Sequence, residues 1–157
     1  METKKLEITY QEFSSLEEMH FEDKELALAA IEAIQGAYAP YSNFFVGSAV
    51  RLNDGTIVTG ANQENAAYPS GICAERTAMF SAGASHPGTA MVSIAIAGGI
   101  RGILDSKPAS PCGACRQVMA QYQRISGKDL SVILVGKDKI LKFKRVDDLL
   151  PLIFDNI

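Results

Sequence analysis

The spacing of apolar residues changes along the chain and predicts where helices and strands lie. Glu22 opens a stretch with an acidic first turn and apolar residues at helical spacing, which predicts a helix. Gly36 and Pro40 mark its end, because glycine and proline both stop helices. The apolar face of this predicted helix comprises Ala27, Ala30, Ile31, Ile34 and Tyr38.

A β-hairpin is predicted next. Residues 44–52 are rich in aromatic and β-branched side chains, and residues 56–59 have the same character. The sequence Asn53-Asp54-Gly55 between them is a strong hairpin turn signal. Residues 61–71 contain Asn, Gln, Pro, Ser and Gly, so a loop is expected after the hairpin.

Helices and strands alternate in the second half of the chain. A helix is predicted over residues 72–82, before the turn-rich residues 83–88. Residues 91–97 are almost entirely apolar, which is typical of a central strand. Ser110 and Pro111 predict the start of another helix, with serine as the N-cap and proline in the first turn.

The last elements complete the pattern. The buried stripe of that helix comprises Cys115, Val118, Met119 and Tyr122. Residues 130–135 predict a buried strand, residues 139–145 a final strand and residues 146–150 a helical turn. This order predicts one α/β domain, with a mixed sheet and helices on both faces. Residues 1–21 form a polar extension before it, either a leader or an edge strand over residues 6–10.

Composition and charge narrow the class of partner. The chain has 157 residues, 47% of them hydrophobic and 21% charged, which is ordinary for a globular domain with a buried core. The formal net charge is −3, and we find no clustered basic face of the kind that binds nucleic acid. The densest basic stretch, residues 137–145, fits a solvated strand and loop. Small substrates are therefore favoured over polynucleotides.

The sequence also predicts a cytoplasmic protein. No segment reaches the roughly 18 consecutive apolar residues of a membrane span, and the first residues lack the apolar stretch of a secretion signal. With no export signal, three cysteines argue against a disulfide framework. Cys112 and Cys115 have C-x-x-C spacing, which leaves metal binding or redox chemistry.

The cysteines lie at the starts of predicted helices. Cys73 begins one helix, and Cys112 and Cys115 begin another. Helix N-termini carry partial positive charge and unpaired N–H groups, which lower the thiol pKa and favour thiolates. Three thiolates fill three tetrahedral positions of zinc, and no fourth cysteine closes the site. A catalytic zinc needs such an open position for its water.

Glu75 adds an acid–base group to this site. It follows Cys73 by two residues, close enough to reach that water without binding the metal. A carboxylate there can take a proton from water and return it to a substrate nitrogen. Cys-x-Glu followed by Pro-Cys-x-x-Cys is the three-cysteine form of the zinc deaminase signature.

Over residues 22–157 the chain resembles the small, homotetrameric cytidine deaminases with three zinc cysteines. The matching stretches, in order, are Ala39-Pro-Tyr-Ser-Asn-Phe-Phe-Val-Gly47, Gly60-Ala-Asn-Gln-Glu-Asn-Ala66, Tyr68-Pro69, Cys73-Ala-Glu-Arg76, Pro111-Cys-Gly-Ala-Cys-Arg-Gln117 and Leu149-Leu-Pro-Leu-Ile-Phe154. The resemblance implies a three-layer α/β/α fold with a mixed sheet of roughly five strands. It also implies one zinc ion per subunit and a homotetramer with shared active sites.

The same resemblance assigns substrate contacts within the subunit. Asn62 and Glu64 would hydrogen-bond the ribose 3′-hydroxyl of a nucleoside. Phe44 would line the pyrimidine pocket, and the backbone N–H of Ala74 would hold the base carbonyl. A buried amide and carboxylate that pair with a hydroxyl also reject analogues lacking it, because they are then left unpaired.

Other contacts would come from a neighbouring subunit. In the family, an aromatic residue near the C-terminus stacks on the base, and Phe154 occupies that place. Ala66 and Tyr68 match positions that contribute across the subunit interface.

Arg76 is expected to compensate charge at the metal. Zinc with three thiolates has a net negative charge, which makes a coordinated water harder to ionise. A guanidinium beside the sulfurs would offset that charge, and the resemblance assigns Arg76 the same role.

The implied reaction is hydrolytic deamination of cytidine and deoxycytidine in pyrimidine salvage, with Glu75 moving the protons. A deaminase of a cytosine-bearing antibiotic such as blasticidin S is the alternative, and Asn62, Glu64 and Phe154 favour the nucleoside.

A non-catalytic zinc-stabilised subunit would have no use for Glu75. A closed structural zinc site would need His20 or His86 as fourth ligand, and a surface position is expected for both. A polynucleotide editing enzyme fits the acidic charge least.

Overall fold

The computed structural model describes residues 1–155 and forms three layers. The strands are β1 (Tyr10–Phe13), β2 (Phe44–Leu52), β3 (Ile57–Ala61), β4 (Met91–Ile100), β5 (Ser131–Val135) and β6 (Ile140–Phe143). The helices are α1 (Phe21–Ala33), α2 (Ala74–Ser85) and α3 (Gly113–Ser126). Single 3₁₀ turns occur at Leu16–Glu18, Ile34–Gly36, Tyr68–Ser70 and Val146–Asp148. No helix among these residues is long and apolar enough to cross a membrane.

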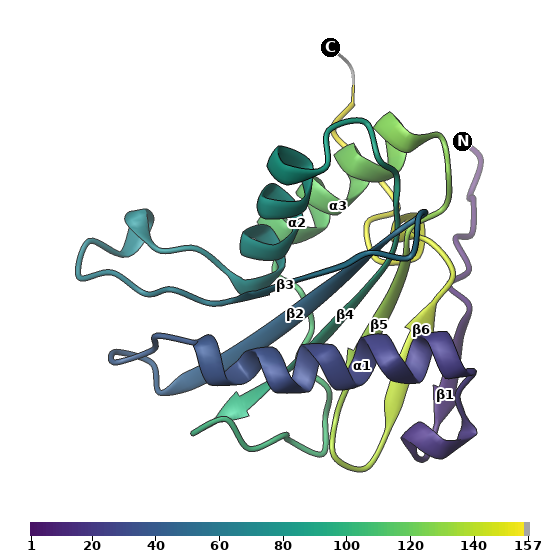
Figure 1. Ribbon diagram of the computed structural model, residues 1–157. Coiled ribbons are helices and arrows are strands. Elements are labelled where there is room, and N and C mark those ends of the chain that lie inside the picture. Colours follow the sequence, from purple (N-terminus) through teal and green to yellow (C-terminus); the bar gives the residue numbers. More distant parts are fainter. Residues whose placement is uncertain (156–157) are drawn as a thin grey trace.

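One mixed sheet lies between the helices, with α1 on one face and α2 and α3 on the other (Figure 1). Successive residues of a strand point to opposite faces, so β4 supplies Ala95 to the α1 side and Ile94 and Ile96 to the other. Burial on both faces explains the nearly continuous apolar run of β4. The predicted three-layer α/β/α class is confirmed.

The sheet order is β1-β6-β5-β4-β2-β3. Strands β4 and β5 are parallel and joined through α3, while the other neighbouring strands are antiparallel. The predicted β2–β3 hairpin is present, with Arg51 opposite Ile57. Gly55 in its turn has a φ of 92°, a conformation that favours glycine.

A close approach sets how α2 lies against the hairpin. A Cβ at Gly60 in β3 would collide with the backbone nitrogen of Ala78 and would lie 2.9 Å from the Ala74 carbonyl oxygen. Only a glycine lets β3 and α2 approach this closely. Because α2 begins at Ala74, this contact also fixes the start of the helix.

The sheet has six strands where roughly five were expected. The extra strand is β1, which pairs with the outer edge of β6 and brings the Tyr10 and Phe143 rings to 5.4 Å. It begins at Tyr10 and not at residue 6, because Tyr10 to Phe13 are the residues that pair with β6, and Phe13 also packs on the apolar cluster under α1. The division into an extension of residues 1–21 and a domain of residues 22–157 stays a prediction. Residues 156–157 lie outside the described part.

Two details of the predicted helices were wrong. Tyr38 does not share the buried face of α1, because the helix ends before it and its side chain is 55% exposed. Ser110 and Pro111 precede α3 instead of opening it, and Cys112 is the N-cap. Similarly, Cys73 is the N-cap of α2.

Candidate active site

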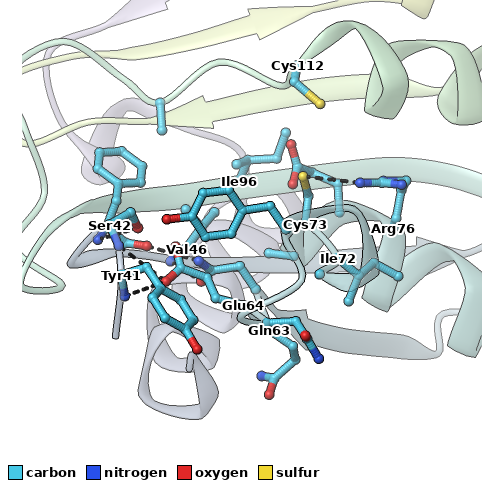
Figure 2. A pocket seen from close by; sticks show the side chains of 18 of the residues that line it. Tyr41, Ser42, Val46, Gln63, Glu64, Ile72, Cys73, Arg76, Ile96 and Cys112 are labelled. Carbon is cyan, nitrogen blue, oxygen red and sulfur yellow. Dashed lines mark hydrogen bonds between the residues drawn. The ribbon is translucent and has the colours of Figure 1, made fainter. Parts of the chain in front are cut away.

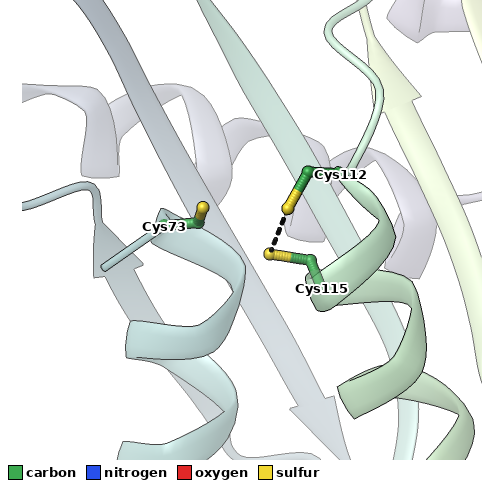
Figure 3. A group of neighbouring side chains, drawn as sticks. All are labelled: Cys73, Cys112 and Cys115. Atoms are coloured by element: carbon green, nitrogen blue, oxygen red, sulfur yellow. Dashed lines mark hydrogen bonds between the residues drawn. The ribbon is translucent and has the colours of Figure 1, made fainter. Parts of the chain in front are cut away.

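Three cysteine side chains converge where α2 and α3 begin (Figure 3). Cys73 and Cys112 are the two N-cap residues, and Cys115 lies in the first turn of α3. Their sulfurs all lie within 4.8 Å of one another. The Sγ atoms of Cys112 and Cys115 are 3.6 Å apart, well beyond the roughly 2.05 Å of a disulfide bond.

The surroundings of the sulfurs favour ionisation at one of them. The Cys115 thiol donates a hydrogen bond to Cys73, and with Arg76 nearby this lowers the pKa of Cys73 to about 5. The same hydrogen bond, with burial, raises the pKa of Cys115. A cluster that stabilises thiolate and lies at two helix N-termini suits a soft divalent cation. Three cysteines are the donor set of a zinc site with one further position.

Arg76 lies against the sulfur cluster. Its Nη2 is 3.5 Å from the Cys73 Sγ, and the hydrogen bond to Cys73 raises the pKa of the guanidinium (Figure 2). Its Nε is buried and has no hydrogen-bond partner within residues 1–155. The guanidinium therefore lies where its positive charge faces the sulfurs, and its role in compensating charge at a bound zinc stays a prediction.

Glu75 follows directly in the first turn of α2 and is only 5% exposed. Burial raises the pKa of its carboxyl, and the negative charge of the Cys73 thiolate raises it further. A carboxyl whose pKa is moved toward neutrality can accept a proton and give it back.

A cavity of about 620 Å³ opens beside these groups (Figure 2). Pockets of this size commonly hold small molecules. Its walls come from the start of β2, the segment between β3 and α2, the start of α2 and residues 109–112. The predicted site residues that line it are Phe44, Asn62, Glu64, Tyr68, Cys73, Ala74, Glu75, Arg76 and Cys112.

Asn62 and Glu64 also hold the backbone of the cavity wall. The Asn62 Nδ2 donates to the Phe44 carbonyl at 2.9 Å, and its Oδ1 accepts from the Val46 N–H at 2.8 Å. Glu64 Oε2 accepts from the backbone N–H groups of Tyr41 at 2.8 Å and Ser42 at 3.2 Å. Hydrogen bonding from the Ser42 side chain and these N–H groups lowers the pKa of Glu64, so it stays ionised.

Ala74 is the first residue of α2 and is fully buried at the cavity wall. The first N–H groups of a helix have no acceptor within the helix. The backbone N–H of Ala74 is therefore suited to binding a carbonyl oxygen.

Three predicted contact residues are exposed. Tyr68 reaches the cavity mouth, where its ring meets Tyr41 edge-on at 5.8 Å, and it is 75% exposed. Ala66 and Phe154 do not line the cavity of their own chain, and Phe154 is 67% exposed.

The histidines take no part in the metal group. His20 is the N-cap of α1, and His86 follows the end of α2 opposite to Cys73. The metal-binding group found in residues 1–155 consists of the three cysteines. A site closed by a histidine is therefore not formed.

Sequence reasoning missed several cavity residues. The cavity lining also includes Tyr41, Ser42, Gln63, Ile72, Ile96 and Ser110. Tyr41 acts on Glu64 through its backbone N–H, which leaves no side-chain signal in a sequence, and Ser42 acts through its backbone N–H and its hydroxyl.

The fold and this site define a zinc-dependent deaminase, and the comparisons with known proteins agree. The family model of the cytidine and deoxycytidylate deaminase zinc-binding region matches residues 21–127. A cytidine deaminase of Halalkalibacterium halodurans is 44% identical over 123 residues, covering 78% of this chain and 86% of the relative. One from Mycobacterium tuberculosis is 38% identical over 122 residues, covering 78% and 81%.

Solved structures agree with the sequences. A cytidine deaminase from Burkholderia pseudomallei superposes with a TM-score of 0.70 and 43% identity, covering 83% of this chain and 97% of that one. The chain belongs to the cytidine and deoxycytidylate deaminase family. Its cofactor is one Zn²⁺ ion, for which the three-cysteine group provides a fitting donor set.

Proposed function

We propose that this chain hydrolyses cytidine and deoxycytidine to uridine and deoxyuridine, releasing ammonia, as a step of pyrimidine salvage. The observation that carries the proposal is Glu75. It is a buried carboxyl beside three zinc-binding sulfurs, at the wall of a cavity of about 620 Å³. The names of the relatives support the substrate, since the three described above are all cytidine deaminases.

The metal is held by Cys73, Cys112 and Cys115. When bound, zinc supplies a water that loses a proton more readily than bulk water does. Arg76 offsets the negative charge of the thiolates, which otherwise opposes that proton loss.

Glu75 carries the protons. It takes one from the attacking water and delivers it to the ring nitrogen of the base, so that water oxygen bonds to the carbon bearing the amino group. The hydroxyl added to that carbon then gives up its remaining proton to the amino group, and its oxygen becomes a carbonyl as the carbon–nitrogen bond breaks and ammonia leaves. Water is consumed and ammonia released, so the reaction needs no other reactant.

The remaining residues orient the nucleoside. Asn62 and Glu64 pair with the ribose 3′-hydroxyl. They use the side-chain oxygens and, in Asn62, the amide N–H that their hydrogen bonds to the backbone leave free. Phe44 lines the side of the base, and the Ala74 N–H donates to the base carbonyl.

We further propose a homotetramer with shared active sites. In it, Phe154 of one subunit stacks on the base bound by its neighbour, and Ala66 and Tyr68 also contribute across the interface. The exposure of Phe154 and Tyr68 supports this arrangement, because large aromatic side chains gain most when they are covered. The cytoplasmic location stays a prediction.

A substrate panel tests the function. Purified, zinc-loaded protein is incubated with cytidine, deoxycytidine, cytosine, cytidine monophosphate, blasticidin S and adenosine, and ammonia release is measured. Ammonia is expected from the two pyrimidine nucleosides. Release from blasticidin S alone, or from none of the compounds, would overturn the proposal.

A further inference from the structure

The C-terminal segment, residues 149–155, lies along α3 and is fastened to it through main-chain atoms. Arg116 in α3 donates from Nη1 to the Leu149 carbonyl at 2.7 Å. Arg124, farther along the helix, donates from Nη1 to the Asp155 carbonyl at 2.6 Å. Both hydrogen-bond acceptors are backbone oxygens, so these contacts fix the path of the segment, and Arg124 also lies 3.9 Å from the Asp155 carboxylate.

Between these two arginine contacts, the Gln117 side chain forms two hydrogen bonds with the backbone of one residue, Phe154. Its Nε2 donates to the Phe154 carbonyl at 2.8 Å, and its Oε1 accepts from the Phe154 N–H at 3.4 Å. One carboxamide thus pairs with both peptide groups of Phe154, as a neighbouring strand would. The Phe154 side chain takes no part in these hydrogen bonds and remains 67% exposed.

The helix that fastens this segment is also the helix that carries two zinc ligands. Cys115 precedes Gln117 by two residues in α3. Arg116 donates from Nε to the Pro111 carbonyl at 2.9 Å, in the peptide before Cys112. One rigid element therefore fixes both the sulfurs and the point where Phe154 leaves the surface.

We propose that Gln117 is a positioning residue. It holds the backbone of Phe154 so that the Phe154 ring is already oriented toward a neighbouring subunit's active site before substrate binds. The inference rests on the proposed function, in which Phe154 stacks on the base across the interface. An unfastened segment would lose conformational freedom each time it stacked, and this loss would weaken substrate binding. Gln117 removes that freedom in advance.

Steady-state kinetics of Gln117→Ala, Phe154→Ala and the double variant with cytidine test this role. We expect each single change to raise KM about tenfold, within the range of one base–aromatic stack, and to leave kcat nearly unchanged. The double variant is expected to match Phe154→Ala, because both changes remove one interaction. Gln117→Glu keeps the acceptor for the Phe154 N–H and is expected to lie between Gln117→Ala and the parent protein.

Gln121→Ala is the matched control, since Gln121 is an exposed glutamine of the same helix. It is expected to leave KM and kcat unchanged. A parent-like KM in Gln117→Ala, an unaltered KM in Phe154→Ala, or additive effects in the double variant would each overturn the proposal. Loss of zinc from Gln117→Ala would do the same, because it would show that Gln117 supports the metal turn.

Amide hydrogen exchange of residues 149–155 separates this inference from the proposed function, since it needs no turnover. Gln117→Ala is expected to exchange faster there than the parent protein, and Gln121→Ala at the parent rate. Equal exchange in Gln117→Ala and the parent protein would overturn the positioning role even if cytidine is deaminated. Inactivity of the parent protein toward cytidine would overturn the function and, with it, the role for Phe154.

Discussion

At the scale of single residues, the side chains around the sulfur cluster shift the pKa values of their neighbours and so set which groups are charged. Cys73 is driven toward its thiolate by Cys115 and Arg76, while Glu75 is driven toward its acid form by burial. These opposite shifts suit two nearby residues to the separate roles proposed for them, holding a cation and exchanging protons.

Arg76 gives a direct test of charge compensation. Arg76→Ala removes the guanidinium beside Cys73 and is expected to weaken zinc binding by about 10–100-fold, the usual effect of losing an outer partner of a metal ligand. Arg76→Lys keeps the charge and should lose less. Competition with a chelator measures the affinity. Unchanged zinc affinity and unchanged turnover in Arg76→Ala would remove the idea.

Asn62 and Glu64 should differ in what their loss does. Asn62→Ala breaks two hydrogen bonds to β2 and is expected to lower the free energy of unfolding by about 1–3 kcal/mol while raising KM. Glu64→Gln is expected to raise KM with a smaller change in thermal midpoint. A Glu64→Gln protein with parent KM would contradict the ribose contact.

The pKa of Glu64 also sets a pH dependence. A depressed folded-state pKa keeps the carboxylate ionised above it, and its contribution is lost only as the pH falls through that value. The ratio of KM between Glu64→Gln and the parent protein should therefore stay constant between about pH 5 and 8. A ratio that falls steadily from pH 8 to 5 would be inconsistent with the lowered pKa.

Residues proposed to act through their side chains were predictable from the sequence. Thiols at C-x-x-C spacing and a carboxylate two residues after a cysteine are distinctive, and the structure brings Cys73, Cys112 and Cys115 together. Contacts made by main-chain atoms were not predictable. The N–H groups that bind Glu64, and the peptide groups that bind Asn62, are present in every residue and leave no pattern.

At the scale of elements, α2 and α3 matter because their first turns meet. The sequence predicted both helices but began α3 two residues early, since Ser110 and Pro111 are common at helix starts. The structure instead uses Cys112 as the N-cap. Strand β1 was placed too early because its position depends on pairing with β6, which lies far away in the sequence.

The contact between β3 and α2 is expected to be sensitive to a single methyl group. Gly60→Ala would press on the backbone of α2 at Ala74 and Ala78, displacing the turn that carries Cys73 and Glu75. We expect destabilisation of about 1–3 kcal/mol and reduced turnover. Gly36→Ala is the matched control, because its Cβ would meet only the Ala61 side chain at 3.6 Å. Equal thermal midpoints and turnover in the two variants would contradict this account.

At the scale of the whole molecule, the shared active site predicts complementation between subunits. Glu75→Gln subunits keep Phe154, and Phe154→Ala subunits keep Glu75. Mixed oligomers should contain sites with both groups. Their turnover at low cytidine concentration should exceed the summed turnover of the two single-variant proteins. No gain in mixed oligomers, or an elution volume matching a monomer for the parent protein, would contradict the shared site.

The central claim is that Glu75 moves the protons at a zinc site built from three cysteines, and Glu75→Gln tests it most directly. The carboxamide has the same shape but cannot accept the proton, so zinc content should remain one ion per chain. Turnover of cytidine is expected to fall by about 10²–10⁴-fold, the usual contribution of general acid–base catalysis. A zinc-loaded Glu75→Gln protein that deaminates cytidine at the parent rate would contradict the account.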